Sequence, residues 1–367
     1  MRRHRNLHPH LRLRLHLHLH LHLHLRRSGP RLLALALLAA TAAVARQPDG
    51  TLGLVRTPNN GVPAIVTPGG RFDAVLTARA SAIRLVAENG EARPALTVTW
   101  REMPGGVFTA DCSVGADTPP GTYALEADAG GDMDRNVRAV YVRKSFPEYY
   151  LVAHLTDTHV GSDRHPRSAA DVFRDAVQAA NESAAAFALV TGDLTENGEV
   201  EQFRTFLEIL DTCTLPTFVC SGNHDRKAHN YENSFGPLTY LFRFGEDGYI
   251  AFDTKDFVVA DSIGPQDADL EVFRRAVKGA RWAIGFSHRY EPDMGIRCQL
   301  VLFVDNPLDH FIFGHYHRAN TEAELAVPWG RTPITVTPAT VDGYMRIIDV
   351  SAKGVRPRPP ERVAAIE

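Results

Sequence analysis

The sequence predicts a layered α/β domain that follows a small all-β domain. From about residue 150 to residue 350, short apolar runs alternate with segments of helical periodicity, as in proteins whose strands and helices form separate layers. From about residue 47 to residue 145, short β-rich runs alternate with turn residues, which is typical of antiparallel strands. At 367 residues, 44% of them hydrophobic, the chain is long enough for two domains with a core each.

Residues 1–45 are predicted to be a low-complexity leader followed by a secretory signal peptide. Eight of the 17 histidines fall in the first 24 positions, and we interpret this tract as a leader rather than as a metal-binding segment. The run LLALALLAATAAVA, at 32–45, has the short apolar stretch and the A-x-A ending of a signal peptide, with cleavage after Ala45. It is too short to span a bilayer, which needs about 20 apolar residues. We expect a periplasmic or extracellular protein without stable membrane insertion.

The charge of the chain changes sharply when this leader is removed. Residues 1–45 hold eight arginines and no acidic residue, so the 40 basic residues fall to 32 against 43 acidic residues, a net charge near −11. Such a chain is not expected to bind duplex nucleic acid or an anionic membrane. A small phosphorylated substrate remains compatible, because its site needs only local positive charge. The sequence identifies no protein partner.

Residues 46–146 are predicted to form an immunoglobulin-like β-sandwich. Alternate residues such as Tyr123, Leu125 and Ala127 lie on one face of an extended chain, and the turns recur at the spacing of a small antiparallel sandwich. The expected strands are FDAVL (72–76), LTVTW (96–100), GVFTA (106–110), TYALEA (122–127) and VRAVYV (137–142).

Residues 147–355 are predicted to form the α/β domain. Its expected helices are the alanine-rich segment 169–186 and the amphipathic segment 200–210. Its expected buried strands lie in LVAHLTD (151–157), FALVTGD (187–193), PTFVCSGNHD (216–225), WAIGFS (282–287) and FIF (311–313).

Two further features complete the chain. Residues 356–367, which begin with RPRPPER, are expected to be an extended Pro/Arg-rich tail. Export permits disulfides, but the four cysteines allow three full pairings and the sequence favours none of them. These cysteines are Cys112, Cys213, Cys220 and Cys298.

Polar side chains directly follow five of the predicted strands. Because sites form at the carboxyl ends of strands in open α/β sheets, we expect these side chains to lie together. Carboxylate, imidazole and amide ligands suit manganese, iron or zinc, and the Asp193 carboxylate is placed to bridge two ions. Glycines 192, 222 and 314 let the backbone turn sharply or approach closely beside them.

The ordered set DTH (157–159), GD (192–193), GNHD (222–225), His288 and GHYH (314–317) resembles the calcineurin-like metallophosphoesterase family, across roughly residues 150 to 350. The resemblance implies a four-layer sandwich, with two mixed β-sheets flanked by helices, and two divalent or trivalent metal ions. It implies that one ion is held by Asp157, His159 and His317, and the other by Asn223, His288 and His315. The resemblance further implies that Asp193 bridges the ions and that His224 is the general acid that protonates the leaving oxygen.

The implied reaction is phosphoester hydrolysis by a hydroxide that bridges the two ions, because metals lower the pKa of bound water towards about 7. GDLTENGE, at 192–199, is similar to cyclic-nucleotide phosphodiesterases of this superfamily and favours a diester substrate. A phosphomonoesterase on the same site is the alternative. Glu196 stands where the purple acid phosphatases carry a tyrosine ligand, so a purple iron site is not expected. A non-catalytic surface-binding protein that uses the β-sandwich is disfavoured, since no proposed ligand is missing.

Several polar residues near these motifs are expected to have no role in the chemistry. Asp225 is interpreted as completing the GNHD turn, and Tyr316 as a packing residue that points away from the ions. His154 and His310 are interpreted as structural, and His165 and His229 as solvent-exposed. Arginines 226, 289 and 318 flank motifs and could bind phosphate, but solvated surface positions are at least as compatible with them.

Overall fold

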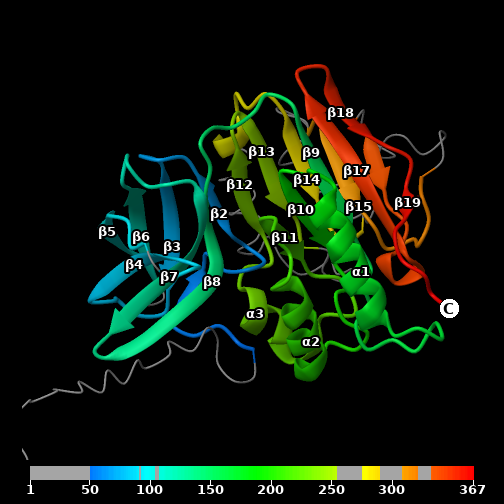
Figure 1. The fold of residues 1–367 in the computed structure, drawn as a ribbon, viewed down its shortest axis with the longest axis horizontal. Helices are drawn as coiled ribbons and strands as arrows, with labels where there is room; N and C mark the ends of the chain where they lie inside the picture. Colours follow the sequence, from blue (N-terminus) through cyan, green and yellow to red (C-terminus); the bar gives the residue numbers. More distant parts are fainter. Residues whose placement is uncertain (1–49, 91, 104–106, 254–274, 290–307, 321–331) are drawn as a thin grey trace, which may run out of the picture. The chain divides into compact units, whose positions relative to one another are not determined.

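Four β-sheets organise the part of the chain that the structure, a computed structural model, describes (Figure 1). That part comprises residues 50–90, 92–103, 107–253, 275–289, 308–320 and 332–367. The predicted leader and signal peptide and the fourth cysteine, Cys298, lie outside it.

The two N-terminal sheets have four strands each and share one core. The first sheet contains, in order, β1 (Val55–Thr57), β3 (Arg71–Leu76), β6 (Val107–Val114) and β5 (Leu96–Met103). The second contains β2 (Ala64–Val66), β8 (Asp132–Val142), β7 (Gly121–Ala129) and β4 (Ala82–Ala87). Leu76 from the first sheet packs with Leu85, Leu125 and Val140 from the second. The five predicted strands are confirmed, β1, β2 and β4 were missed, and the immunoglobulin-like assignment stays a prediction.

The third sheet is one of the two sheets of the α/β part of the chain. It contains, in order, β11 (Thr217–Cys220), β10 (Phe187–Thr191), β9 (Tyr150–Leu155), β17 (Tyr344–Ser351) and β18 (Gly354–Pro357). Strands β9, β10 and β11 are parallel, whereas β17 runs antiparallel to β9. The segment expected to be an extended tail contributes β19 (Glu361–Arg362), which pairs with β17, as does β18. The chain end therefore belongs to this sheet.

The fourth sheet faces the third and completes the pair of mixed sheets. It contains β12 (Tyr240–Phe244), β13 (Asp247–Ala251), β14 (Ala283–Phe286), β15 (His310–Phe313) and β16 (Ile334–Val336). Strands β13 to β16 are parallel, and β12 is antiparallel to β13. Phe187 and Phe218 of the third sheet share a buried cluster with Tyr249 and Phe286 of the fourth. The ring centroids of Phe187 and Tyr249 are 5.2 Å apart, so the sheets meet through aromatic packing.

Helices cover the outer face of the third sheet (Figure 1). They are α1 (Ala169–Glu182), α2 (Val200–Leu210) and α3 (Asn230–Phe235). Phe173 of α1 stacks on Phe206 of α2 at 4.8 Å. Helix α1 is capped by Ser168 and ends before the predicted residue 186, because Ala184 adopts φ 59°. The resemblance places a second layer of helices in the connections between β13, β14 and β15, and these connections lie mostly outside the described residues. Within the described residues, no helix is long and apolar enough to cross a membrane.

Hydrogen bonds join the N-terminal segment to β11, the edge strand of the third sheet. The Val219 amide of β11 donates to the Gly61 carbonyl at 2.8 Å, and Asn59 Nδ2 donates to the Phe235 carbonyl at 3.0 Å. The described residues, from 50 to 367, accordingly belong to one compact unit. An unpaired edge strand exposes backbone groups that favour aggregation, and the segment around Gly61 covers part of that edge.

Candidate metal centre

The predicted metal ligands lie just beyond the carboxyl ends of five parallel strands in the two facing sheets. They are Asp157 and His159 after β9, Asp193 after β10, Asn223 after β11, His288 after β14, and His315 and His317 after β15. His288 Nε2, from the fourth sheet, lies 3.1 Å from Asp193 Oδ2, from the third. The two sheets therefore bring their strand ends to one place.

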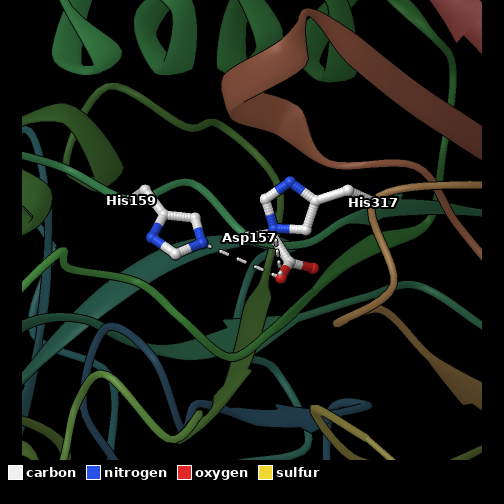
Figure 2. A group of neighbouring side chains, drawn as sticks. All are labelled: Asp157, His159 and His317. Carbon is white, nitrogen blue, oxygen red and sulfur yellow. Dashed lines mark ion pairs between the residues drawn. The ribbon is translucent and has the colours of Figure 1, made fainter. Parts of the chain in front are cut away.

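The first group of side chains consists of Asp157, His159 and His317. Figure 2 shows both imidazoles directing a ring nitrogen toward the Asp157 carboxylate, whose Oδ1 lies 3.3 Å from His317 Nε2 and 4.0 Å from His159 Nε2. Asp157 is fully buried and His159 nearly so. The ligand atoms of the three residues all lie within 4.8 Å of one another, so one cation could contact them together.

The second group consists of Asp193, His288 and His315. His288 Nε2 lies 3.0 Å from His315 Nδ1, and the ligand atoms of the group again lie within 4.8 Å of one another. Asp193 Oδ2 also lies 3.7 Å from His159 Nε2 of the first group. Asp193 thus stands between the two groups, as the bridging role requires.

Three buried acceptor atoms at the centre test whether cations fit. Asp157 Oδ1, His159 Nε2 and Asn223 Oδ1 are buried and have no hydrogen-bond partner. Buried polar atoms are nearly always paired, so three such atoms on predicted ligands indicate partners of another kind. Because His159 donates from Nδ1 to Glu196 Oε2 at 2.8 Å, its Nε2 has a free lone pair. This set of nitrogen and oxygen donors fits manganese, iron or zinc ions.

The buried carboxylates make the centre favour positive charge. Burial lowers the pKa of His288, but Asp193 and Asp157 outweigh it and raise that pKa to about 9. The pKa of His317 likewise rises to about 9 against burial, because the carboxylates of Asp157 and Asp342 lie beside its two ring nitrogens. Burial raises the pKa of Asp193, but His288 overcomes this effect and the net shift is downward. A metal ion that binds here must displace protons from these imidazoles.

The backbone is strained at the predicted ligands. Among the described residues, nine that are not glycine have a positive φ, and five of these are predicted ligands. They are Asp157 (52°), His159 (44°), Asp193 (45°), His315 (68°) and His317 (53°). Such conformations are uncommon outside glycine and cluster at functional sites.

Two glycines allow these loops to touch, as the sequence predicted. A Cβ atom at Gly314 would lie 1.8 Å from Thr156 Oγ1 and 2.4 Å from Asp157 Oδ2. A Cβ atom at Gly222 would lie 2.1 Å from Asp193 Oδ1. Any larger residue at either position would displace a predicted ligand.

His224 lies at the edge of the centre and is held at two points. Its backbone amide donates to Asp193 Oδ1 at 2.9 Å, and its ring nitrogen Nδ1 lies 2.6 Å from the Glu196 carbonyl. Since a carbonyl only accepts, Nδ1 carries a hydrogen and Nε2 is left for other partners. The ligand atoms of His224, His159 and Asp193 also lie within 4.8 Å of one another, so geometry alone permits His224 as a ligand.

Asp225 has the structural role expected of it. Its buried carboxylate accepts from the amides of Leu194 and Thr195 at 3.0 Å each and from the Gly222 amide at 2.8 Å. It also accepts from Thr195 Oγ1 at 2.8 Å. These bonds tie the loop that follows β10 to the loop that follows β11.

Sequence reasoning missed the residues behind the predicted ligands. Glu196 accepts from His159, yet it was noted only for the tyrosine it replaces. Asp342 Oδ2 lies 3.3 Å from His317 Nδ1 and belongs to no motif. The prediction of an exposed His165 was wrong, because its side chain is only 20% exposed and its Nε2 lies 2.7 Å from Asp342 Oδ1. Tyr316 is 48% exposed, and its ring packs edge-on against Phe313, with centroids 6.1 Å apart, as its interpretation as a packing residue requires.

Comparison with known proteins assigns the α/β part of the chain. Residues 150–319 match the family model for the calcineurin-like phosphoesterase. The chain therefore contains a calcineurin-like phosphoesterase domain, the domain of a hydrolase that acts on phosphoester bonds.

More specific relatives are distant. Over 116 residues the chain is 29% identical to the DNA double-strand break repair protein Mre11 of Thermoplasma acidophilum, a match that covers 29% of this chain and 30% of that protein. A purple acid phosphatase from yellow lupin (Lupinus luteus) seeds is 10% identical, with a TM-score of 0.49 over 86% of this chain and 73% of that one. A dimetal phosphatase from Danio rerio is 13% identical, with a TM-score of 0.42 over 59% and 98%.

Proposed function

We propose that the protein is an exported phosphoesterase that requires two metal ions and hydrolyses small phosphodiesters. The observation that carries the proposal is the convergence of four strand ends, those of β9, β10, β14 and β15, on two groups of ligand atoms with Asp193 between them. In this proposal Asp157, His159 and His317 would hold one ion, Asn223, His288 and His315 would hold the other, and Asp193 would serve both. When bound, the ions supply Lewis-acid stabilisation of the charge on the phosphate oxygens.

The residues of the chain have separate tasks in this reaction. The ligand loops fix the positions at which the phosphate oxygens bind, which lowers the entropic cost of reaching the reactive geometry. His224 is the general acid. Its Nδ1 donates to the Glu196 carbonyl at 2.6 Å, so Nε2 of the protonated ring is the atom that gives a proton to the leaving oxygen. Serine and cysteine nucleophiles are not needed.

The preference for a diester rests on the likeness of GDLTENGE to cyclic-nucleotide phosphodiesterases. Glu196 supports a distinction from purple acid phosphatases, because its carboxylate accepts from His159 Nδ1 rather than replacing the tyrosine ligand. A phosphomonoester is the second candidate substrate on the same centre. The acidic character expected after removal of residues 1–45 disfavours duplex DNA, although Mre11 is named for DNA repair.

The remaining parts of the chain have proposed roles of a supporting kind. Residues 1–45 direct export, 46–146 form an immunoglobulin-like domain, 147–355 form the catalytic domain, and 356–367 form its C-terminal extension. The hydrogen bond from Val219 to Gly61 supports a stabilising role for the N-terminal domain, because β11 leads directly to Asn223 and His224.

Hydrolysis of two model esters tests this function. The purified protein, with two manganese ions per chain, is assayed on bis(p-nitrophenyl) phosphate and p-nitrophenyl phosphate. We expect turnover of both, with the larger kcat/KM on the diester. A larger value on the monoester would favour the second candidate. A folded, metal-loaded protein that turns over neither ester would contradict the phosphoesterase function.

A further inference from the structure

Asp342 lies behind the His317 imidazole, on the side opposite the predicted metal position. His317 Nε2 lies 3.3 Å from Asp157 Oδ1, whereas His317 Nδ1 lies 3.3 Å from Asp342 Oδ2. The ring is therefore placed between two carboxylates. Asp342 follows none of the five strands that supply the predicted ligands; it belongs to η4 (Thr340–Asp342), which immediately precedes β17.

The backbone fixes Asp342 relative to the first group of ligands. The Thr340 amide donates to the Thr156 carbonyl at 2.7 Å, and the Val341 amide donates to the Asp157 carbonyl at 3.1 Å. On the other side of η4, the Gly343 carbonyl accepts from the Val363 amide at 2.8 Å. The loop that carries Asp342 is thus bonded both to the loop of a predicted ligand and to the C-terminal segment.

The hydrogen bonds of the Asp342 carboxylate leave one oxygen for His317. Its Oδ1 lies 2.7 Å from His165 Nε2 and 3.3 Å from Arg164 Nε, so Oδ2 remains for the His317 ring. Arg164 Nη1 also lies 3.1 Å from His317 Nδ1, and the two contacts with Nδ1 exclude each other. If Nε2 gives its lone pair to a cation, Nδ1 carries the hydrogen. It can then donate to Asp342 but cannot accept from Arg164.

We propose that Asp342 is a positioning residue, which holds His317 in the tautomer and orientation that direct Nε2 to a metal ion. This inference rests on the proposed function, because it takes His317 as a ligand. Carboxylates behind metal-bound histidines raise metal affinity by about 10- to 100-fold. Asp342→Ala should therefore lower the affinity of the protein for one of the two ions by about 10- to 100-fold and leave its affinity for the other ion unchanged.

Titration calorimetry with MnCl₂ on the metal-stripped full-length protein tests the inference. His317→Ala marks the binding step that belongs to this ion, and Asp342→Ala should weaken that same step. Asp342→Asn keeps an acceptor oxygen, so its manganese affinity in that step should lie between the affinities of Asp342→Ala and the unmodified protein. Asp349→Asn is the matched control, because Asp349 is a carboxylate of β17 that accepts from Arg358 and Tyr149 and, among the described residues, from no histidine. It should change neither step.

Kinetics give a second measurement that a general structural defect would not reproduce. The manganese concentration for half-maximal hydrolysis should rise about 10- to 100-fold in Asp342→Ala, while kcat at saturating manganese stays within a few-fold of the unmodified protein. Unchanged manganese binding in Asp342→Ala, with a lost step in His317→Ala, would overturn the inference but leave the proposed function intact. Loss of that step in Arg164→Ala, with Asp342→Ala normal, would assign the role to Arg164. An unmodified protein that binds no manganese would overturn both proposals.

Discussion

Gly61 lies where the N-terminal segment meets the edge of the third sheet, and Gly61→Ala tests how much this contact contributes to stability. Its φ of 132° is rarely adopted by L-residues, and an added Cβ would lie 2.4 Å from Cδ1 of Phe235. The Phe235 ring cannot retreat easily, because it is fully buried between Phe203 and Phe206. Backbone strain costs about 1–3 kcal/mol and overpacking costs about 1–3 kcal/mol, so the free energy of unfolding should fall by about 2–6 kcal/mol.

The chain offers a control that separates the two effects. Gly354 has φ 128°, but a Cβ there would meet nothing within 4 Å. Gly354→Ala should therefore show the strain alone, about 1–3 kcal/mol. Urea unfolding of the metal-stripped variants, followed by tryptophan fluorescence, measures both changes. Equal losses in the two variants would refute the reasoning, because the contact between Gly61 and Phe235 would then contribute nothing to stability.

Four further predictions concern the centre itself. Asp193→Ala should lose both ions and activity together, and an active, metal-loaded variant would show that no bridge is needed. His224→Ala should retain both ions in elemental analysis and slow turnover about 10²- to 10⁴-fold, whereas loss of an ion would make it a ligand. Asp225→Asn should lower the free energy of unfolding by about 1–3 kcal/mol, since its amide group leaves a buried backbone donor unpaired; a loss below about 0.5 kcal/mol would contradict this. In the metal-stripped protein, folding raises the pKa of His288 to about 9, from about 6.5 in the unfolded chain. Protonated His288 therefore stabilises the fold fully below about pH 6.5, and this contribution disappears as the pH rises to about 9. The apo melting temperature should fall over that range, and a rise would refute the assignment.

Local sequence was sufficient for the elements that support the centre. A buried parallel strand followed by polar residues is a contiguous pattern, so β9 and the position of Asp157 could be predicted together. The same holds for β15 and His317. Amphipathic spacing likewise predicted α2 with its observed bounds of 200–210. In each case the residues that determine the element lie within the element, so no knowledge of tertiary contacts was required.

The missed features depend on contacts between distant parts of the chain. Asp342 reaches His317 only because η4 is bonded to the loop after β9, and no local pattern announces that contact. The proline-rich chain end, for which the sequence predicts an extended tail, contributes β19, which pairs with β17. Strand β4 was overlooked because AIRLVA lacks strict alternation, and its pairing with β7 supplies the stability that its own sequence does not indicate.

The strained ligand loops explain why the centre is bonded so densely. Residues such as Asp157 and His315 hold left-handed backbone conformations that an isolated loop would leave. They are retained because Asp157 Oδ2 accepts from the His315 amide at 2.8 Å and from Thr156 Oγ1 at 2.6 Å, while Gly314 brings the two loops together. The ligand atoms are therefore placed by the sheets and by these bonds. Because the loops are already ordered, cation binding costs less conformational entropy, and more of the interaction free energy appears as affinity.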